Sequence, residues 1–216
     1  MERAFGLSIP RTLDEACDPS RMALLVYDMQ AGIVRHMPEA EAFTARVVQV
    51  VDAARRAGMR VLFGRHLSLP NELAGVFQLR TAMAWQRVER IEDVRPLFLP
   101  DAPDTQLVPE LAPRPSEAVF DKLAMSMFVG TPLELVLRDC GINAFAIVGA
   151  VTEIGIEPTV RHGADLGFIP VVVADACASV DPAAGERSLA SLDYARMSLQ
   201  TDVETITRLL GQPVSP

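Results

Sequence analysis

The sequence predicts an α/β protein built on an open parallel sheet with helices on both faces. Short apolar runs alternate with helical patterns along the chain, which is typical of parallel β/α units. Two of the runs, NAFAIVGA (143–150) and FIPVVVAD (168–175), are almost continuously hydrophobic, as expected for strands covered on both faces. No domain linker or internal repeat interrupts the 216 residues, so we predict a single domain over residues 1–216.

The elements follow from the period of the apolar residues and from the positions of Gly and Pro. Strands are expected at 22–27 (MALLVY), 60–65, 117–122, 143–150 and 168–175, and helices at 43–58, 79–88, 131–141, 185–197 and 201–211. The stretch 96–116 holds six prolines, too many for a continuous helix or a central strand. We interpret this stretch as an excursion over the surface, of a length that also suits the wall of a pocket.

The helix signal is strongest in TPLELVLRDCG (131–141). Thr131 is expected to cap this helix, Pro132 to take its first position, and Glu134 to complete a capping box. Its apolar residues recur at helical spacing, and Gly141 ends the pattern.

Composition and charge narrow the classes of partner and location. The formal net charge is −8 without a basic block, so neither nucleic acid nor an anionic membrane is expected as a partner. Cys17, Cys140 and Cys177 lie far apart without metal-site spacing, which favours reduced thiols and a cytoplasmic setting. Residues 1–20 lack the apolar run of a secretion signal, and no segment approaches the roughly 20 apolar residues of a membrane span.

In open parallel sheets, ligands bind beyond the carboxyl ends of the strands. The residues predicted at that edge are Asp28, His66, Lys122, the 149–155 turn and Asp175. Asp28 follows an aliphatic strand, where desolvation would raise its pKa and suit it to proton transfer. The alternative interpretation of Asp28 is a helix-capping or turn aspartate.

Two further features of this edge have a functional and a structural interpretation. Lys122 would either hold Asp28 ionised and polarise a substrate oxygen, or be an ordinary exposed lysine. Gly155 lies near a helix start, where unpaired N–H groups can bind an anion, and Pro158 suits the first turn. Equally, Gly155 would permit close packing, and sequence spacing leaves both interpretations open.

No metal site is predicted, because His36, His66 and His162 lack partners at ligand spacing. His66 is a candidate to bind substrate, whereas His162 is expected to be a packed or surface residue. Cys177 has no histidine nearby in sequence to activate it, which favours a small buried hydrophobe over a nucleophile. Trp85 belongs to an apolar stripe that would line a pocket or pack on the sheet.

Three segments together resemble the isochorismatase-like, or cysteine hydrolase, superfamily. They are LLVYDMQ (24–30), FDKLAMSMFVGTPLELVLRDCGI (120–142) and IVGAVTEIGIEPTVRHGADLGFIPVVVADACAS (147–179). Their order and spacing match that superfamily over about residues 22 to 179. Each segment alone would be weak, and the combination is specific.

The resemblance implies a three-layer α/β/α, Rossmann-like fold with a six-stranded, mostly parallel sheet. It implies that the protein forms a homo-oligomer, a dimer or a tetramer, and that Asp28 and Lys122 are catalytic partners. It also suggests a cis peptide bond between Ala150 and Val151, which would aim backbone N–H groups at the substrate.

The resemblance further bears on the reaction. Amidases of the superfamily place a nucleophilic cysteine at the position matching Gly155, where this sequence has no nucleophilic side chain. Isochorismatases are similar to this sequence in carrying glycine there, and they hydrolyse a vinyl ether by donating a proton from the aspartate. The resemblance therefore implies a small-molecule hydrolase that uses Asp28 and Lys122 without a cysteine, cofactor or metal.

One segment departs from the isochorismatase pattern. Residues 72–88 lack the aromatic- and glycine-rich character of the isochorismatase substrate segment, although Gln78, Arg80, Gln86 and Arg87 are candidates to bind a carboxylate. Two alternatives to vinyl-ether hydrolysis therefore stay open. One is an amidohydrolase in which Asp28 activates water to attack a small amide or ureido compound, and the other is a non-catalytic ligand-binding homologue.

Overall fold

Six parallel strands form the centre of the computed structural model, which describes residues 1–211. The strands lie in the order β5–β4–β3–β6–β7–β8. Their number, six, is the number that the resemblance implies. Their bounds are β3 (Met22–Tyr27), β4 (Arg60–His66), β5 (Ala118–Lys122), β6 (Ala144–Ala150), β7 (Ile169–Ala178) and β8 (Leu199–Thr201). The predicted open parallel sheet is confirmed, while the three-residue strand β8 was not predicted from the residue pattern.

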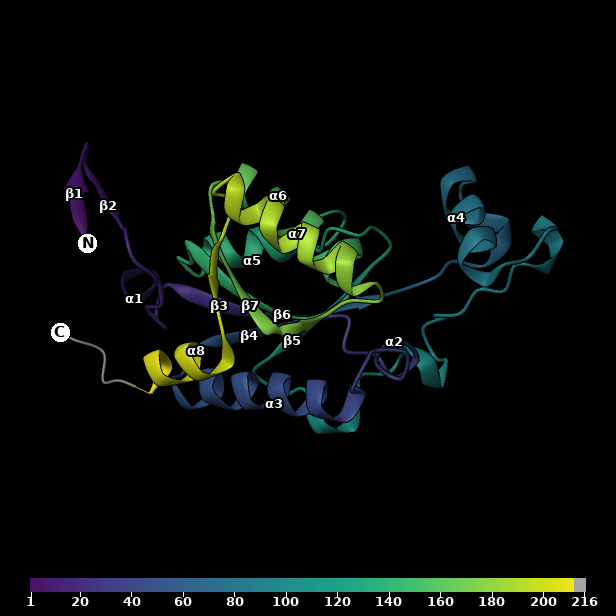
Figure 1. Cartoon of the computed structure of the whole chain (residues 1–216), viewed down its shortest axis with the longest axis horizontal. Coiled ribbons are helices and arrows are strands. Elements are labelled where there is room, and N and C mark those ends of the chain that lie inside the picture. The colour runs from purple at the N-terminus through teal and green to yellow at the C-terminus, as the bar shows by residue number, and fades with distance from the viewer. Residues whose placement is uncertain (212–216) are drawn as a thin grey trace.

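Helices cover both faces of this sheet and produce the predicted three layers (Figure 1). The helices α3 (Ala40–Arg56) and α8 (Val203–Leu210) pack on one face. The helices α5 (Leu133–Asp139), α6 (Glu157–Asp165) and α7 (Pro182–Tyr194) cover the other face. The helices α3, α5, α7 and α8 overlap the ranges predicted from sequence, with ends that differ by up to three residues, whereas no range was predicted for α6.

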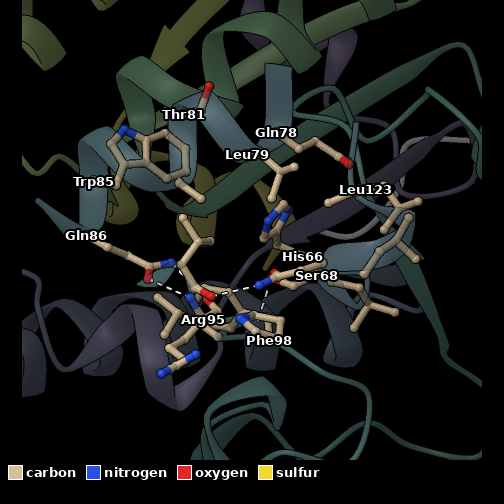
Figure 2. Close-up of a pocket in the computed structure, with 18 of the residues that line it drawn as sticks. His66, Ser68, Gln78, Leu79, Thr81, Trp85, Gln86, Arg95, Phe98 and Leu123 are labelled. Atoms are coloured by element: carbon tan, nitrogen blue, oxygen red, sulfur yellow. Dashed lines mark hydrogen bonds between the residues drawn. The ribbon is translucent and has the colours of Figure 1, made fainter. Parts of the chain in front are cut away.

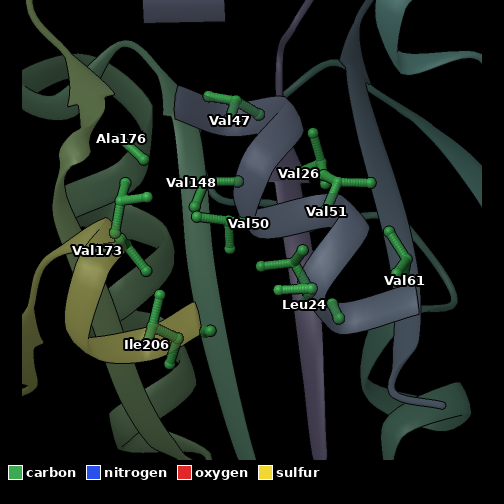
Figure 3. Close-up of a cluster of buried hydrophobic side chains, with 14 of the residues drawn as sticks. Leu24, Val26, Val47, Val50, Val51, Val61, Val148, Val173, Ala176 and Ile206 are labelled. Carbon is green, nitrogen blue, oxygen red and sulfur yellow. The ribbon is translucent and has the colours of Figure 1, made fainter. Parts of the chain in front are cut away.

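Alternating residues of the strands supply the two halves of the core. On β3, Leu24 and Val26 point toward α3, where they contact the aliphatic stripe of that helix (Figure 3). Leu25 and Tyr27 point to the opposite face and join the cluster under α5 and α6. Every residue of β3 is buried, because helices cover both faces of the sheet at this strand. Its continuously hydrophobic sequence fits this position.

The capping pattern predicted for α5 was wrong in two details. Pro132 precedes the first helical residue instead of occupying that position, and Glu134 forms an ion pair with Arg138 at 2.8 Å instead of a capping box. Thr131 still accepts a hydrogen bond from the N–H of Leu133. The helix therefore begins at Leu133, one residue later than the predicted start at Pro132.

The placement of Asp175 at the ligand-binding edge was also wrong. Strand β7 continues to Ala178, so Asp175 lies inside the strand. Its carboxylate accepts a hydrogen bond from the N–H of Val203, the first residue of α8, at 2.9 Å. Asp175 thus supports a helix start on the core side of the sheet.

The remaining elements are short and lie outside the sheet. They are the antiparallel pair β1 (Glu2–Ala4) and β2 (Leu7–Ile9), α1 (Leu13–Ala16), α2 (Ala31–Val34) and α4 (Val76–Gln86). Figure 1 shows α4 standing apart from the layers, beyond the end of the sheet that carries α2. No helix within residues 1–211 is long and apolar enough to cross a membrane.

The proline-rich excursion returns to the carboxyl end of β3. The N–H of Val108 donates to the carbonyl of Met29, and the N–H of Ala31 donates to the carbonyl of Gln106. The excursion therefore lies against the residues that directly follow Asp28 in its own chain. It ends next to Glu117, whose carboxylate accepts hydrogen bonds from the Nε and one Nη of Arg55 on α3, both at 2.8 Å.

Candidate active site

Asp28 and Lys122 form a buried ion pair at the carboxyl ends of the strands. Asp28 follows β3 and Lys122 ends β5, so the lysine side chain reaches across the intervening strand β4. The Lys122 Nζ lies 2.9 Å from the Asp28 Oδ2, and the two side chains are only 1% and 8% exposed. The structure thus brings together the two residues that the sequence singles out, and it excludes the exposed-lysine interpretation of Lys122.

Burial controls the protonation of Asp28. Desolvation raises the pKa of this carboxyl to about 6, although the nearby Lys122 ammonium opposes the rise. The Asp28 Oδ1 is buried without a hydrogen-bond partner. The residue also has a left-handed backbone, with φ 48°, and its N–H donates to the carbonyl of Gly64. One oxygen of Asp28 is therefore fixed by Lys122, and the other is left for a ligand.

Tyr27 is a member of the site that sequence reasoning missed. Its ring lies under Lys122, with the Nζ 4.2 Å from the ring centroid, and its hydroxyl donates to the carbonyl of Met125. Burial and the Asp28 charge raise the pKa of Tyr27 well above its usual value, so the phenol stays neutral. The only signal in the sequence was its place directly before Asp28 in a buried strand.

Gly155 packs directly against Tyr27. A Cβ at position 155 would lie 2.2 Å from the Tyr27 hydroxyl oxygen and 2.4 Å from two ring carbons. The N–H groups of Ile154, Gly155 and Ile156 all donate to the carbonyl of Val151. Those three groups are therefore engaged within the turn, and the geometry favours the close-packing interpretation of Gly155 over an anion site.

The backbone before this turn has the geometry that the resemblance suggests. The peptide bond between Ala150 and Val151 is cis. Tyr27 pairs with Gly149 in the register of β3 and β6, which places this bond beside Asp28 at the point where the strand order reverses. Ligands of open α/β sheets bind at such switch points. The contact of Ala150 and Val151 with substrate stays a prediction.

His66 ends β4, between Asp28 and Lys122. It pairs with Lys122 in the register of β4 and β5. Burial, together with the Lys122 charge, lowers the pKa of His66 to about 4, so its imidazole is neutral near pH 7. Its Nδ1 is buried without a partner. A neutral ring with an open nitrogen is suited to hydrogen bonding with a substrate.

Gln30 is a second residue that sequence reasoning missed, although it stands in the segment LLVYDMQ. Its side chain is completely buried. The amide oxygen accepts from the N–H of His66 at 2.7 Å, and the amide nitrogen donates to the carbonyls of His66 and Thr105. Gln30 therefore links the end of β4 to the proline-rich excursion and holds the backbone of His66 in place.

Replacing Gln30 with leucine is expected to lower the free energy of unfolding by about 2–4 kcal/mol, because three buried backbone groups lose their partners. Urea unfolding measures this loss. The control is Gln106→Leu, since the exposed Gln106 amide also donates to two carbonyls. The control is expected to cost under about 1 kcal/mol. Equal losses in the two variants would contradict the role assigned to Gln30.

A cavity of about 410 Å³ opens beside His66 (Figure 2). Its wall includes one side of α4, the loop 94–98 and residues 123–125, which directly follow Lys122. Of the predicted substrate-binding residues, His66, Gln78, Trp85 and Gln86 line it. Asp28 and Lys122 are not among the residues that line the cavity, although their neighbours His66 and Leu123 are.

The carboxylate-binding cluster proposed for α4 does not assemble. Arg80 and Arg87 are exposed and do not line the cavity, and Gln86 bonds through both ends of its amide to the backbone of Arg95. The Gln78 amide oxygen accepts from the N–H of Gly75 at the start of α4. This geometry does not support a carboxylate-binding role for Arg80, Gln86 or Arg87.

The cysteines do not supply a nucleophile at the pair. Burial raises the pKa of Cys177 above its usual range, and its thiol faces the carbonyl of Ile147. Burial also raises the pKa of Cys17 to about 12. Cys140 caps the end of α5. Within residues 1–211, no group of three or more His, Cys, Asp and Glu side chains is placed to hold a metal ion.

Comparison with known proteins gives one family match. A family model described as Isochorismatase domain matches residues 22–205. Solved structures with a similar fold include a cysteine hydrolase from Pseudomonas syringae pv. phaseolicola, with a TM-score of 0.75 and 23% identity over 89% of this chain and 93% of that chain. An isochorismatase family protein from Desulfovibrio vulgaris has a TM-score of 0.74 and 20% identity, over 89% and 99% of the two chains. N-carbamoylsarcosine amidase from Thermoplasma acidophilum has a TM-score of 0.68 and 21% identity, over 85% of this chain and 97% of that chain.

Proposed function

The chain belongs to the isochorismatase family of hydrolases, and from this we propose that it cleaves a small molecule by acid–base chemistry at Asp28 and Lys122. The observation that carries the proposal is the buried pair itself. Asp28 has a pKa of about 6 and one oxygen without a partner, and Lys122 contacts the other oxygen at 2.9 Å. Gly155 has no side chain to act as a nucleophile, which supports a reaction through Asp28.

For a vinyl ether, the protonated Asp28 acts as a general acid. It donates its proton to the terminal alkene carbon, which leaves an oxocarbenium ion. Water adds to this cation and returns a proton to the Asp28 carboxylate, and the resulting hemiketal separates into a ketone and an alcohol. Lys122 stabilises the carboxylate while it is ionised. With a pKa of about 6, roughly a tenth of the molecules carry the required proton at pH 7.

For an amide or ureido compound, the ionised Asp28 acts as a general base. It takes a proton from water as the water attacks the carbonyl carbon, and it then returns the proton to the leaving nitrogen. The observation that favours this second candidate is the same pKa, because most molecules hold Asp28 ionised at neutral pH. A third candidate is a ligand-binding homologue without turnover, for which Asp28 would have no chemical role.

A substrate panel separates these candidates. Isochorismate and neutral vinyl ethers are followed by release of their ketone or aldehyde product, and small amides by release of ammonia, each with Asp28→Asn as the control. Turnover that is lost in the folded variant supports catalysis at Asp28 and identifies the bond class. Binding without turnover in the wild-type protein supports the ligand-binding homologue.

The pH dependence of kcat/KM is expected to distinguish acid from base catalysis. If Asp28 acts as an acid, kcat/KM is constant well below about pH 6 and falls about tenfold per pH unit above that pKa. If Asp28 acts as a base, the slope has the opposite sign, and kcat/KM falls as the pH drops through about 6. A profile with no limb near pH 6 would contradict a rate-determining role for Asp28.

We also propose that the enzyme works without a cofactor or metal, as a homo-oligomer and in a reducing, cytoplasmic compartment. The support is the family resemblance for assembly and the three unpaired cysteines for the compartment. Light scattering of the purified protein tests the assembly, with a dimer or a tetramer as the expected result. Activity after exhaustive dialysis against a chelator tests the absence of a metal.

A further inference from the structure

The cavity beside His66 has almost no charge on its wall. His66 and Arg95 are its only ionisable lining residues within the described part of the chain. His66 is neutral near pH 7, since burial lowers its pKa to about 4. Arg95 is an exposed residue whose backbone N–H and carbonyl bond to the Gln86 amide. Apart from Arg95, the wall of the cavity therefore offers no positive charge to a ligand.

The two cations next to His66 are already paired with carboxylates. Lys122 contacts Asp28 at 2.9 Å, and Arg65 forms two hydrogen bonds to Asp121 at 2.7 and 2.9 Å. A substrate carboxylate at the His66 end would thus lose its hydration without gaining a counter-charge, and this desolvation is costly.

Three aromatic side chains line the cavity instead. Phe77 and Trp85 line the cavity from α4, although they are 69% and 57% exposed in the chain. Phe98 lines the opposite wall and packs edge-on against the His66 ring at a centroid distance of 5.7 Å (Figure 2). A flat apolar ligand would cover these rings and remove their surface from water.

We infer that the substrate is an uncharged, largely apolar molecule that carries a ring, with its hydrolysable polar end at His66. The ring binds among Phe77, Trp85 and Phe98, and the open Nδ1 of His66 meets the polar end. This inference rests on the proposed function, because it assumes that the reacting bond lies next to Asp28 and Lys122. It excludes substrates that bring a carboxylate to that end, isochorismate among them.

Trp85 makes the test direct, because it is the only tryptophan in the chain. Its fluorescence is titrated with two matched pairs of compounds that differ by a carboxylate at the polar end, benzamide against benzoate and phenyl vinyl ether against 2-phenoxyacrylate. Isothermal titration calorimetry provides an independent reading of the same binding. Each neutral compound is expected to bind at least about tenfold more tightly than its carboxylate partner. Tighter or equal binding of the carboxylates, or binding of neither kind, would overturn the inference.

A charge introduced into the cavity is expected to reverse the preference. Figure 2 shows Leu79 pointing from α4 toward His66, and Leu79→Arg places a cation there. We expect this variant to bind the carboxylate probes at least about tenfold more tightly than the wild-type protein does. Ala84→Arg is the matched control, since Ala84 is exposed on the same helix and does not line the cavity. An equal gain in both variants would overturn the inference.

Failure of the inference and failure of the proposed function give different results. The titrations measure binding alone, and the panel with Asp28→Asn measures turnover. Neutral probes that bind tightly while no compound is turned over would leave the binding inference standing and refute catalysis. Turnover of isochorismate at Asp28, with tight binding of the carboxylate probes, would support catalysis and refute the inferred substrate class.

Discussion

Replacing Asp28 with asparagine is expected to lower kcat/KM by about 10²–10⁴-fold, the range that a general acid or base contributes. Asparagine keeps the size of the side chain but cannot carry the transferable proton. It also tolerates the left-handed backbone of residue 28, where φ is 48°. The measurement is steady-state turnover of the best substrate from the panel, at a pH near 6.

The control for this variant concerns Lys122. Its side chain is 1% exposed, so removal of the Asp28 charge leaves a buried cation without its partner and costs about 3–5 kcal/mol. Urea unfolding is therefore measured beside turnover. The double variant Asp28→Asn/Lys122→Met removes both charges and is expected to recover stability without recovering activity. An unchanged kcat/KM in folded Asp28→Asn would contradict the proposed mechanism.

Replacing Gly155 with alanine is expected to lower the free energy of unfolding by about 2–3 kcal/mol. The added Cβ would lie 2.2 Å from the Tyr27 hydroxyl oxygen, so the phenol has to move. Tyr27 is 1% exposed and lies under the Lys122 ammonium, so its displacement is also expected to disturb the pair of Asp28 and Lys122 and, under the proposed mechanism, to lower kcat. Urea unfolding and steady-state kinetics measure the two effects.

Two comparisons isolate this contact. Gly211→Ala is the matched control, because a Cβ there would meet its nearest neighbour at an ordinary 3.4 Å. In a Tyr27→Ala background, Gly155→Ala is expected to cost far less, since the ring that it strikes is gone. If Gly155→Ala costs the same with and without the Tyr27 ring, the contact between these residues does not explain the glycine. The same geometry predicts that Gly155→Cys does not yield a thiol hydrolase.

The part of the site that could be predicted from sequence follows from the position of residues at strand ends. Asp28 directly follows one predicted strand, and Lys122 ends another. Parallel strands bring the ends of such segments to the same edge of the sheet. The burial of β3 could be predicted for the same reason, because its residues are hydrophobic without a break. The ion pair could not be predicted without the strand order, which leaves a single strand, β4, between β5 and β3.

The parts that were missed depend on contacts between distant residues. The contact of Tyr27 with Gly155 and the bonds from Gln30 to His66 and Thr105 join separate segments, and no local pattern marks them. Strand β8 has only three residues, so its period is too short to detect, and pairing with β7 decides its conformation. The sequence predicts a helix near residue 80. It does not predict that this helix, α4, lies apart from the sheet and lines a cavity.

The position of β5 at the edge of the sheet has a consequence for how the protein loses activity on heating. Lys122 sits on this outermost strand, whereas Asp28 follows the central strand β3. Edge segments exchange their amide hydrogens through local openings of lower free energy than the global transition. The pair can therefore separate, and inactivation can begin, while the central strands remain native. The bidentate contact of Arg55 with Glu117 holds the start of β5 to α3, and so we expect this distant ion pair to raise the temperature at which Lys122 and Asp28 separate.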